Sequence, residues 1–315
     1  MYFFAVFVFS ILLLYKSSGW VIKYSLALSR ILRVSVFAIG FVIIAVSTSL
    51  PELMVGIFSA LEGRVGLSVG NVFGANLADL TLVLGTVALV GGTILIKKRE
   101  DAENLLELLV VSFIIAAILF FGGYLSVLHG AILIFIFAFY SYRLYKKDHA
   151  KMCAVHKHHH TEHKQSRKVI LRLVLSLGIM LVSGRLLVES SVQIADFFGL
   201  ATTFVGATIL SAGTTSPELM LELRAVKQKC YGLALGDLFG SLITNLTLVL
   251  GTAIVISPTS IDIINIAAVM PFLFAATIVV WYSIHNKMGI TRYPAIALVS
   301  IYALFIFREA LSAIF

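Results

Sequence analysis

Two carboxylates stand beside hydroxyl side chains at helical spacing in this sequence. Glu52 follows Thr48 by four residues and Ser49 by three, so the three side chains share one face of a helix. The arrangement returns at an offset of 166 residues around Glu218, with hydroxyls at Ser211, Thr214 and Thr215. Carboxylate, hydroxyl and backbone carbonyl oxygens are the ligands that hard cations prefer. Each copy therefore predicts one half of a cation site.

A proline precedes each of these carboxylates, at Pro51 and Pro217. Proline has no amide hydrogen, and its ring clashes with the carbonyl four residues earlier, which for Pro51 belongs to Ser47. We therefore expect the carbonyls near Ala45 to Thr48 to be free of the helix ladder. In hydrocarbon such groups are tolerated only when they are buried in protein or line a cavity, where a cation can satisfy them. Helix kinking alone would explain the prolines, but a membrane carboxylate is costly unless it is paired or used.

The segment after each proline carries a polar stripe at a spacing of four residues. The first stripe is Asn71, Ala75 and Asp79, and its counterpart is Asp237, Ser241 and Asn245. Glycines stand beside both stripes and are expected to let neighbouring helices approach closely: Gly70, Gly74, Gly236 and Gly240. The stripes would then complete the site that the glutamates begin.

These motifs belong to a longer duplication. Residues 45–86 and 211–252 align without a gap and share 17 identities in 42 pairs. A duplicated, broken, carboxylate-bearing membrane helix is the best sequence indication of a transporter's ion site.

The elements that must position these motifs are membrane helices. The chain has 315 residues, of which 60% are hydrophobic and 13% charged, with a mean hydropathy of +1.02. Such a composition predicts an all-α polytopic membrane protein. We expect ten transmembrane helices: five in residues 1–145, five in residues 168–315, and between them a linker, 146–167, rich in histidine and lysine. The helices are predicted near 2–27, 34–60, 66–93, 104–123, 126–145, 168–193, 200–224, 231–256, 262–284 and 293–312.

Loop charges indicate the orientation of the chain. With both termini outside the cell membrane, the cytoplasmic loops and the linker collect most of the basic residues, and the outer loops and ends keep only Arg64 and Arg308. An odd number of spans in each half makes the second repeat inverted relative to the first. The linker is then cytoplasmic.

Several other functions are excluded or disfavoured. The net charge of +8 lies in short loops between apolar runs, so it predicts membrane orientation and not nucleic-acid binding. We find no nucleotide-binding glycine loop, no zinc-enzyme signature and no nucleophile–base pair, so the chain is not expected to be an enzyme or to need a cofactor. Cys153 and Cys230 are not expected to form a disulfide.

Charged side chains outside the motifs have plainer explanations. The linker histidines favour a solvated cationic loop over a transition-metal site. Within apolar segments, Lys16 and Arg185 are expected to snorkel or to pair, Arg185 with Glu189 one helical turn away.

The two blocks resemble the repeats of the calcium/cation antiporter superfamily, and specifically its prokaryotic sodium/calcium exchangers, archaeal members above all. They are similar to that family's Gly-Thr-Ser-Leu-Pro-Glu-Leu motif, which is followed by Gly-Asn-x-x-Gly-Ser-Asn. The resemblance covers both cores and the ten-helix layout. It implies that Glu52 and Glu218 bind calcium with the carbonyls of Thr48 and Thr214. It further implies flanking sodium sites and a central diamond, with oxygens from Ala45, Ser49, Ser211, Thr215, Ser241, Asp79 and Asn245.

This chain departs from the family pattern at several of these positions. Ala75 lacks the hydroxyl that archaeal members tend to have there. The central acid is Asp79 in the first repeat and faces Asn245, whereas related exchangers often carry the acid in the second repeat. Asp237 stands where asparagine is usual. Thr215 and Ser47 replace an expected serine and glycine. The departures bear on the number and type of counter-ions.

Charge arithmetic leaves the counter-ion open. Glu52, Asp79 and Glu218 sum to −3 when ionised; calcium leaves −1, and three sodium ions leave zero. Three like charges close together repel, so we expect a proton on one of them, Asp79, when calcium is bound. The leading hypothesis is a Ca²⁺/Na⁺ antiporter that normally extrudes Ca²⁺. The alternatives are a Ca²⁺/H⁺ or K⁺-dependent exchanger with the same site, a passive channel, and an intramembrane enzyme.

Exchange by alternating access follows if calcium and the counter-ion compete for the same two glutamates. The long first and sixth helices are the expected moving pair, rocking against the repeat core. The expected partners are small inorganic cations and the lipid bilayer, and the chain is expected to function as a monomer.

Overall fold

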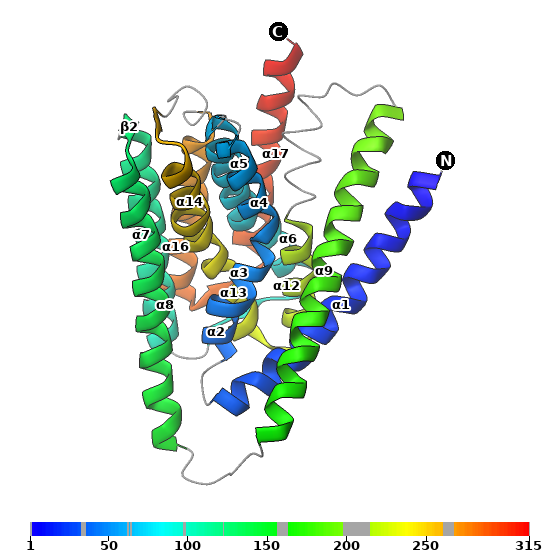
Figure 1. The fold of residues 1–315 in the computed structure, drawn as a ribbon, viewed down its shortest axis with the longest axis vertical. Coiled ribbons are helices and arrows are strands. Elements are labelled where there is room, and N and C mark those ends of the chain that lie inside the picture. Colours follow the sequence, from blue (N-terminus) through cyan, green and yellow to red (C-terminus); the bar gives the residue numbers. More distant parts are fainter. Residues whose placement is uncertain are drawn as a thin grey trace.

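The computed structural model describes residues 2–32, 36–61, 63, 65–96, 99–121, 123–155, 163–197, 215–260 and 268–314. These residues are almost wholly helical (Figure 1), which confirms the predicted helical class. The chain's two ends lie at one end of the molecule, and the end of α8 and the start of α9 lie at the other (Figure 1). The first half contains α1 (Tyr2–Leu32), α2 (Val36–Ile39), η1 (Gly40–Ile44), α3 (Ala45–Thr48), α4 (Leu50–Leu61), α5 (Val65–Ala78), η2 (Asp79–Val83), α6 (Leu84–Val90), α7 (Arg99–Phe121) and α8 (Val127–Val155).

The second half repeats the boundaries of the first in the elements that carry the motifs. It contains α9 (His163–Phe197), α12 (Ser216–Lys227), α13 (Tyr231–Thr244), η4 (Asn245–Val249), α14 (Leu250–Ile256), α16 (Met270–Lys287) and α17 (Arg292–Ile314). Each element from α4 to α6 begins and ends 166 positions before its counterpart among the elements from α12 to α14. The duplication in sequence is therefore also a duplication of local backbone structure.

Two short ladders join the halves. β1 (Ile94–Leu95) pairs antiparallel with β4 (Gly289–Ile290), and β2 (Tyr124–Leu125) pairs antiparallel with β3 (Thr259–Ser260). No strands were predicted from the sequence. Each is only two residues long, which is too short for an alternating pattern to reveal.

The helices have the length and apolarity of membrane spans in part of the described chain. Four helices are long and apolar enough to cross a membrane: Phe3–Leu32, Ser68–Val90, Tyr231–Ile256 and Arg292–Leu311. A fifth span would be the bent pair Phe37–Thr48 and Leu50–Ile57. Each of the ten predicted apolar segments contains helix where it is described, but ten crossings remain a prediction.

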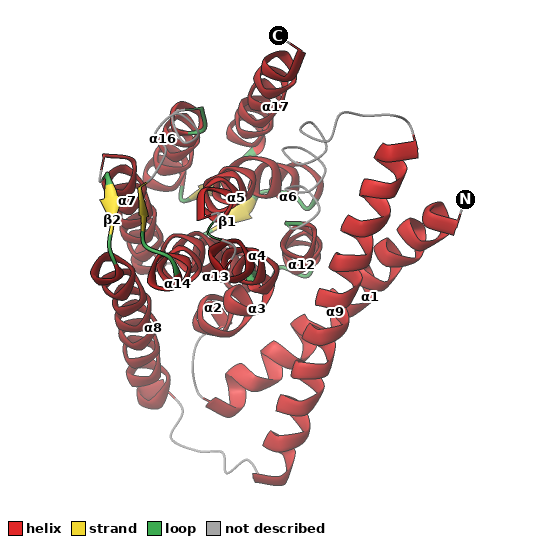
Figure 2. Cartoon of the chain, turned by 45° about the horizontal axis from the view of Figure 1, so that its top comes forward, coloured by secondary structure: helices red, strands yellow, loops and turns green. Residues whose placement is uncertain are grey.

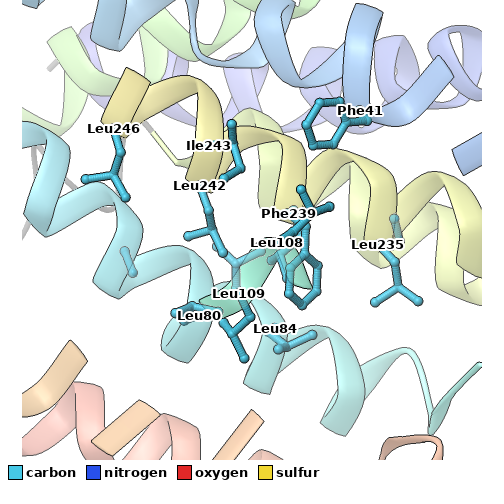
Figure 3. Close-up of a cluster of buried hydrophobic side chains, with 14 of the residues drawn as sticks. Phe41, Leu80, Leu84, Leu108, Leu109, Leu235, Phe239, Leu242, Ile243 and Leu246 are labelled. Carbon is cyan, nitrogen blue, oxygen red and sulfur yellow. The ribbon is translucent and has the colours of Figure 1, made fainter. Parts of the chain in front are cut away.

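Buried apolar side chains from both halves meet at the centre (Figure 3). The cluster draws on η1, η2, α6, α7, α13 and η4 and includes Phe41, Leu80, Leu84, Leu108, Leu109, Leu235, Phe239, Leu242, Ile243 and Leu246. Lipid is as apolar as these side chains, so close van der Waals packing holds such helices together rather than expulsion from water.

Glycines on α13 permit one of the closest helix contacts. A Cβ atom at Gly236 would overlap the carbonyl oxygen of Phe37, and one at Gly240 would lie 2.6 Å from the Cβ of Ala45. The close approach expected beside the second stripe is therefore present. At Gly70 and Gly74 a Cβ would meet nothing within 4 Å among the described residues, so the same expectation is not met there.

α1 and α9 lie side by side along one flank of the core (Figure 2). α1 packs chiefly on α9 and also touches α12. These are the first and sixth predicted helices, and they flank the α2–α6 and α12–α14 elements that carry the motifs, touching them chiefly through α12.

Candidate cation site

The proline segments form matching breaks in the helices that carry the glutamates. α3 ends at Thr48, Ser49 has turn dihedral angles (φ −79°, ψ 7°), and the helix axis bends by 46° before α4 continues. Thr215 has nearly the same angles (φ −83°, ψ 1°) before α12. Glu52 and Glu218 therefore each lie in the first turn of a new helix. Unpaired amides and the helix dipole favour a carboxylate at this position.

Fewer carbonyls are freed by the proline than expected. The Ser49 amide donates to the carbonyl of Ala45 at 3.0 Å, so Ala45 keeps its ladder partner and that part of the prediction is wrong. The physical reason is that the break begins at the carbonyl of Ser47, four residues before Pro51, and Ser49 still completes the preceding turn. The Ala45 carbonyl oxygen has a second lone pair with which it could contact a cation. The Thr48 hydroxyl, 3.2 Å away, already lies within hydrogen-bond distance of that oxygen.

π-helical turns begin at two of the predicted site residues. Asp79 is the first residue of η2, and Asn245 is the first residue of η4. Both turns lie in helices that continue on either side, and such π-bulges are frequent at functional sites. Each bulge widens the helix by one residue and re-aims the side chains around it. Nothing in the sequence periodicity predicted them.

Three hydrogen bonds tie the repeats together at the site. The Thr48 hydroxyl lies 3.1 Å from Oδ1 of Asp237, which joins α3 to α13. The Asn245 amide donates to Oδ1 of Asn76 at 3.0 Å, and the Asn76 amide donates to the carbonyl of Leu242 at 3.2 Å. Asn76 was not among the predicted site residues. It stands at the last position of the Gly-Asn-x-x-Gly-x-Asn pattern that begins at Gly70, and that position could have identified it.

The carboxylates of the two repeats converge in a buried region. Glu52, Asp79 and Glu218 are 1–2% exposed, and Glu218 lies within electrostatic range of both other acids. Asp237 is fully buried and within range of Asp79 and Glu218. Glu222, a residue that the sequence interpretation did not single out, is 1% exposed and within range of Asp79 and Asp237. Five acids thus share one interior.

No basic side chain balances these acids among the buried residues that the structure describes. Oxygens that are buried and have no hydrogen-bond partner in the described part of the chain include Asp79 Oδ1, Glu218 Oε2, Ser49 Oγ, Ser241 Oγ and Asn245 Oδ1. An ionised carboxylate left so in a low-dielectric interior is very costly, so it must take up a proton or bind a cation.

The chemistry of the donors suits hard cations. Within the described residues, no three acidic, histidine or cysteine side chains lie close enough to hold a metal ion by themselves. A cation bound here would therefore also take hydroxyl, amide or backbone carbonyl oxygens, which is the mixed oxygen set of calcium and sodium sites. Ser49, Ser241 and Thr215 are buried beside the carboxylates' helices and could supply such oxygens.

Some predictions fall outside the described residues. Ser211 and Thr214 are among these residues, so their assignment to the cation site stays a prediction. The same holds for the histidines at 156 and 158–160. Cys230 is free, as expected.

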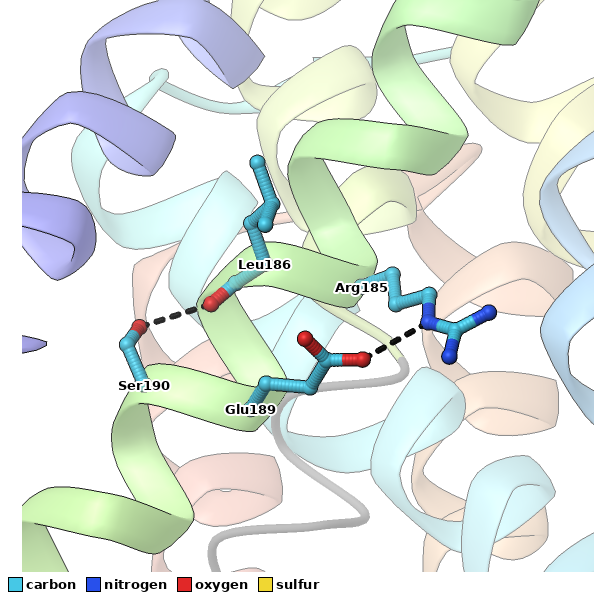
Figure 4. A network of polar contacts seen from close by, with 4 residues as sticks. All are labelled: Arg185, Leu186, Glu189 and Ser190. Atoms are coloured by element: carbon cyan, nitrogen blue, oxygen red, sulfur yellow. Dashed lines mark hydrogen bonds and ion pairs between the residues drawn. The ribbon is translucent and has the colours of Figure 1, made fainter.

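The charged residues predicted to be structural lie away from the site. Nε of Arg185 lies 2.7 Å from a carboxylate oxygen of Glu189 on α9 (Figure 4), which confirms the predicted helical pair. Both side chains are exposed. The Lys16 ammonium lies 5.9 Å from the ring centroid of Trp20, one helical turn away.

Comparisons with known proteins agree with the geometry. The sodium/calcium exchanger protein family matches residues 2–146 and 168–309. The sodium/calcium exchanger MaX1 of Methanosarcina acetivorans is 26% identical over 359 residues, covering 96% of this chain and 97% of its own. The putative antiporter CaxA of Alkalimonas amylolytica is 31% identical over 263 residues, covering 80% of each chain.

The fold is also that of a solved exchanger. A structure of the sodium-calcium exchanger NCX_Mj, soaked with Na⁺ and Ca²⁺, superposes with a TM-score of 0.82 at 24% identity, over 97% of this chain and 98% of that one. Chain-long matches to the family and to its members leave one conclusion: this chain belongs to the sodium/calcium exchanger protein family.

Proposed function

We propose that this protein is a secondary-active antiporter that exchanges Ca²⁺ for Na⁺ across the cell membrane. The observation that carries the proposal is the convergence of Glu52, Asp79 and Glu218 in an interior with no buried basic partner among the described residues. Similar proteins are called a sodium/calcium exchanger and a putative antiporter, which supports cation exchange as the class of activity. Such an activity needs no catalysis and no cofactor.

Shared ligands give the coupling. Calcium would bind Glu52 and Glu218 with the carbonyls of Thr48 and Thr214. Sodium would occupy flanking positions with oxygens from Ala45, Ser49, Ser211, Thr215 and Ser241, and Asp79 with Asn245 would complete the centre. Because both ions need the two glutamates, one displaces the other. A requirement for an occupied site before the access side changes turns this competition into exchange.

The proposed setting is ten spans in two inverted halves, with both termini extracellular, the linker cytoplasmic and the chain acting as a monomer. α1 and α9 are the proposed moving pair, since they flank the motif-bearing core. Inward sodium movement would then drive calcium out of the cell.

A second candidate, Ca²⁺/H⁺ exchange, is favoured by two observations. The buried acids number five: Glu52, Asp79, Glu218, the Asp237 that the second stripe already supplied, and Glu222, which the sequence did not single out. Such an excess of negative charge raises the number of protons that the empty protein must hold. Ala75 moreover removes a hydroxyl oxygen from the expected sodium ligands.

The test is calcium uptake into proteoliposomes with sodium, proton and potassium gradients imposed one at a time. An outward sodium gradient should drive uptake, and the proton gradient alone should not. Calcium uptake that is unaffected by the sodium gradient but driven by the proton gradient would refute Ca²⁺/Na⁺ exchange and support Ca²⁺/H⁺ exchange. Calcium entry with no counter-ion gradient at all would indicate a channel and refute both.

A further inference from the structure

A second pair of buried carboxylates lies one helical turn from the predicted site. Glu222 follows Glu218 by four residues on α12, so both side chains lie on one helix face, about 6 Å apart along the axis. Asp237 lies on α13, which packs against α12. Glu222 lies on the side of Glu218 that is nearer to Lys227, the last residue of α12.

Both side chains are fully buried and incompletely satisfied. Glu222 is 1% exposed and Asp237 is 0% exposed. Oε1 of Glu222 and Oδ2 of Asp237 have no hydrogen-bond partner within the described residues. The Glu222 carboxylate lies within electrostatic range of Asp237 and of Asp79. The other oxygen of Asp237, Oδ1, is 3.1 Å from the Thr48 hydroxyl.

The nearest basic residue along α12 is turned elsewhere. The Arg224 guanidinium lies 4.5 Å from the ring centroid of Tyr15 and donates to that residue's carbonyl. It therefore anchors α12 to α1 and does not neutralise Glu222. Lys227, nearer the helix end, is exposed.

The repeat shows that the helix packing does not require these acids. The counterparts of Glu222 and Asp237 at the 166-residue offset are Gly56 and Asn71, both neutral. α4 and α5 nevertheless have the same boundaries as α12 and α13. At Gly56 even a Cβ would lie 3.2 Å from Ser68 Oγ and from Val249, so a longer side chain there would be crowded. The extra charge is thus a feature of one side of the site only.

We infer that Glu222 and Asp237 form a second binding site for a divalent cation, between the central site and the membrane face that bears Lys227. This inference rests on the proposed function and extends it. Two carboxylates and the Thr48 hydroxyl are oxygen ligands of the type that calcium takes, and water completes its coordination. Two divalent cations neutralise four of the five carboxylates, and one proton or one sodium ion neutralises the fifth.

The site gives the cation a resting place on its path. A calcium ion arriving from the Lys227 face meets Glu222 and Asp237 before it reaches Glu52 and Glu218. No such pair precedes the glutamates from the opposite face, where Gly56 and Asn71 stand. Loading from the two faces is therefore unequal.

Equilibrium dialysis with ⁴⁵Ca²⁺ tests the inference, on the full chain in lipid nanodiscs without sodium. We expect two bound Ca²⁺ per wild-type chain and one in Glu222→Gln and in Asp237→Asn. The double variant Glu52→Gln/Glu218→Gln should also retain one. Glu103→Gln is the matched control, because Glu103 is an exposed acid paired with Arg99, and it should bind two. If Glu222→Gln is not monodisperse, Asp237→Asn carries the test.

Two results would overturn the inference. One is saturation of the wild type at a single Ca²⁺. The other is loss of both ions in Glu222→Gln and Asp237→Asn, since these residues would then only shape the central site. Two bound ions together with no counter-ion-driven uptake in proteoliposomes would refute the proposed function and leave the second site standing.

Discussion

Replacing Asn76 by leucine tests whether the contact between the repeats holds the site in shape. The change keeps the side chain's approximate size and removes two hydrogen bonds, to Asn245 at 3.0 Å and to the Leu242 carbonyl at 3.2 Å. Hydrogen bonds between membrane helices contribute about 0.6 kcal/mol each. The Asn245 amide would then be buried without this hydrogen-bond acceptor, which costs about 1 kcal/mol more. The expected loss is about 2 kcal/mol.

The loss should appear in both stability and cation affinity. For a chain of this size, about 2 kcal/mol lowers the Tm of the detergent-solubilised protein by roughly 4 °C. Asn245 also loses the contact that orients it. If about 1 kcal/mol of the loss falls on the cation-bound state, the half-saturating Ca²⁺ concentration in the uptake assay rises about fivefold.

A neighbouring side chain provides the control. Ser112 and Asn76 line the same small cavity, of about 10 Å³, but the Ser112 hydroxyl donates to the carbonyl of Leu108 in its own helix. Ser112→Ala should therefore cost less than about 0.5 kcal/mol and leave calcium affinity unchanged. Asn76→Leu as stable and as active as Ser112→Ala would refute the reasoning.

Four further predictions follow from the site and its packing. Glu52→Gln or Glu218→Gln should abolish sodium-driven calcium uptake, and near-normal flux in either variant would remove that residue from the ligand set. Asp79→Asn should flatten the rise of exchange with pH, because protons compete with cations for Asp79 at low pH, while changing calcium affinity less; a wild-type pH profile would contradict this. Gly236→Ala should destabilise the protein by about 1–3 kcal/mol through overlap with Phe37, whereas its counterpart Gly70→Ala should be tolerated, and equal thermal stability of the two would count against the packing argument. Burial raises the pKa of the Cys230 thiol above its ordinary value of 9.0, so in a Cys153→Ser background alkylation of Cys230 should be slow at neutral pH and still rise with pH at pH 9, and a rate that levels off below pH 9 would contradict that shift.

The sequence predicted the helices and the duplicated motif well because both depend on local signals. Long apolar runs make helices, and proline breaks them at a fixed place. Even so, the break at Pro51 spares the Ala45 carbonyl, since the preceding turn closes through Ser49. Such detail depends on backbone angles that the residue types leave open.

Features that depend on contacts between distant segments were missed. Asn76 acts through Asn245, which lies in the other half of the chain. Glu222 could not be predicted from the duplication, because its counterpart Gly56 carries no charge. The π-helical turns at Asp79 and Asn245 have no periodicity of their own, because each is a single widened turn inside a regular helix.

The two strand ladders limit how this molecule can deform. β1 precedes α7 and β2 follows it, so the β1–β4 and β2–β3 ladders lie about 35 Å apart, at opposite ends of that helix. Each ladder fastens the first half to the second. Two ladders that far apart resist both hinging and twisting of one half relative to the other, so we expect the core to move as a single rigid body. The movement proposed for α1 and α9 would then take place against a core that keeps its shape.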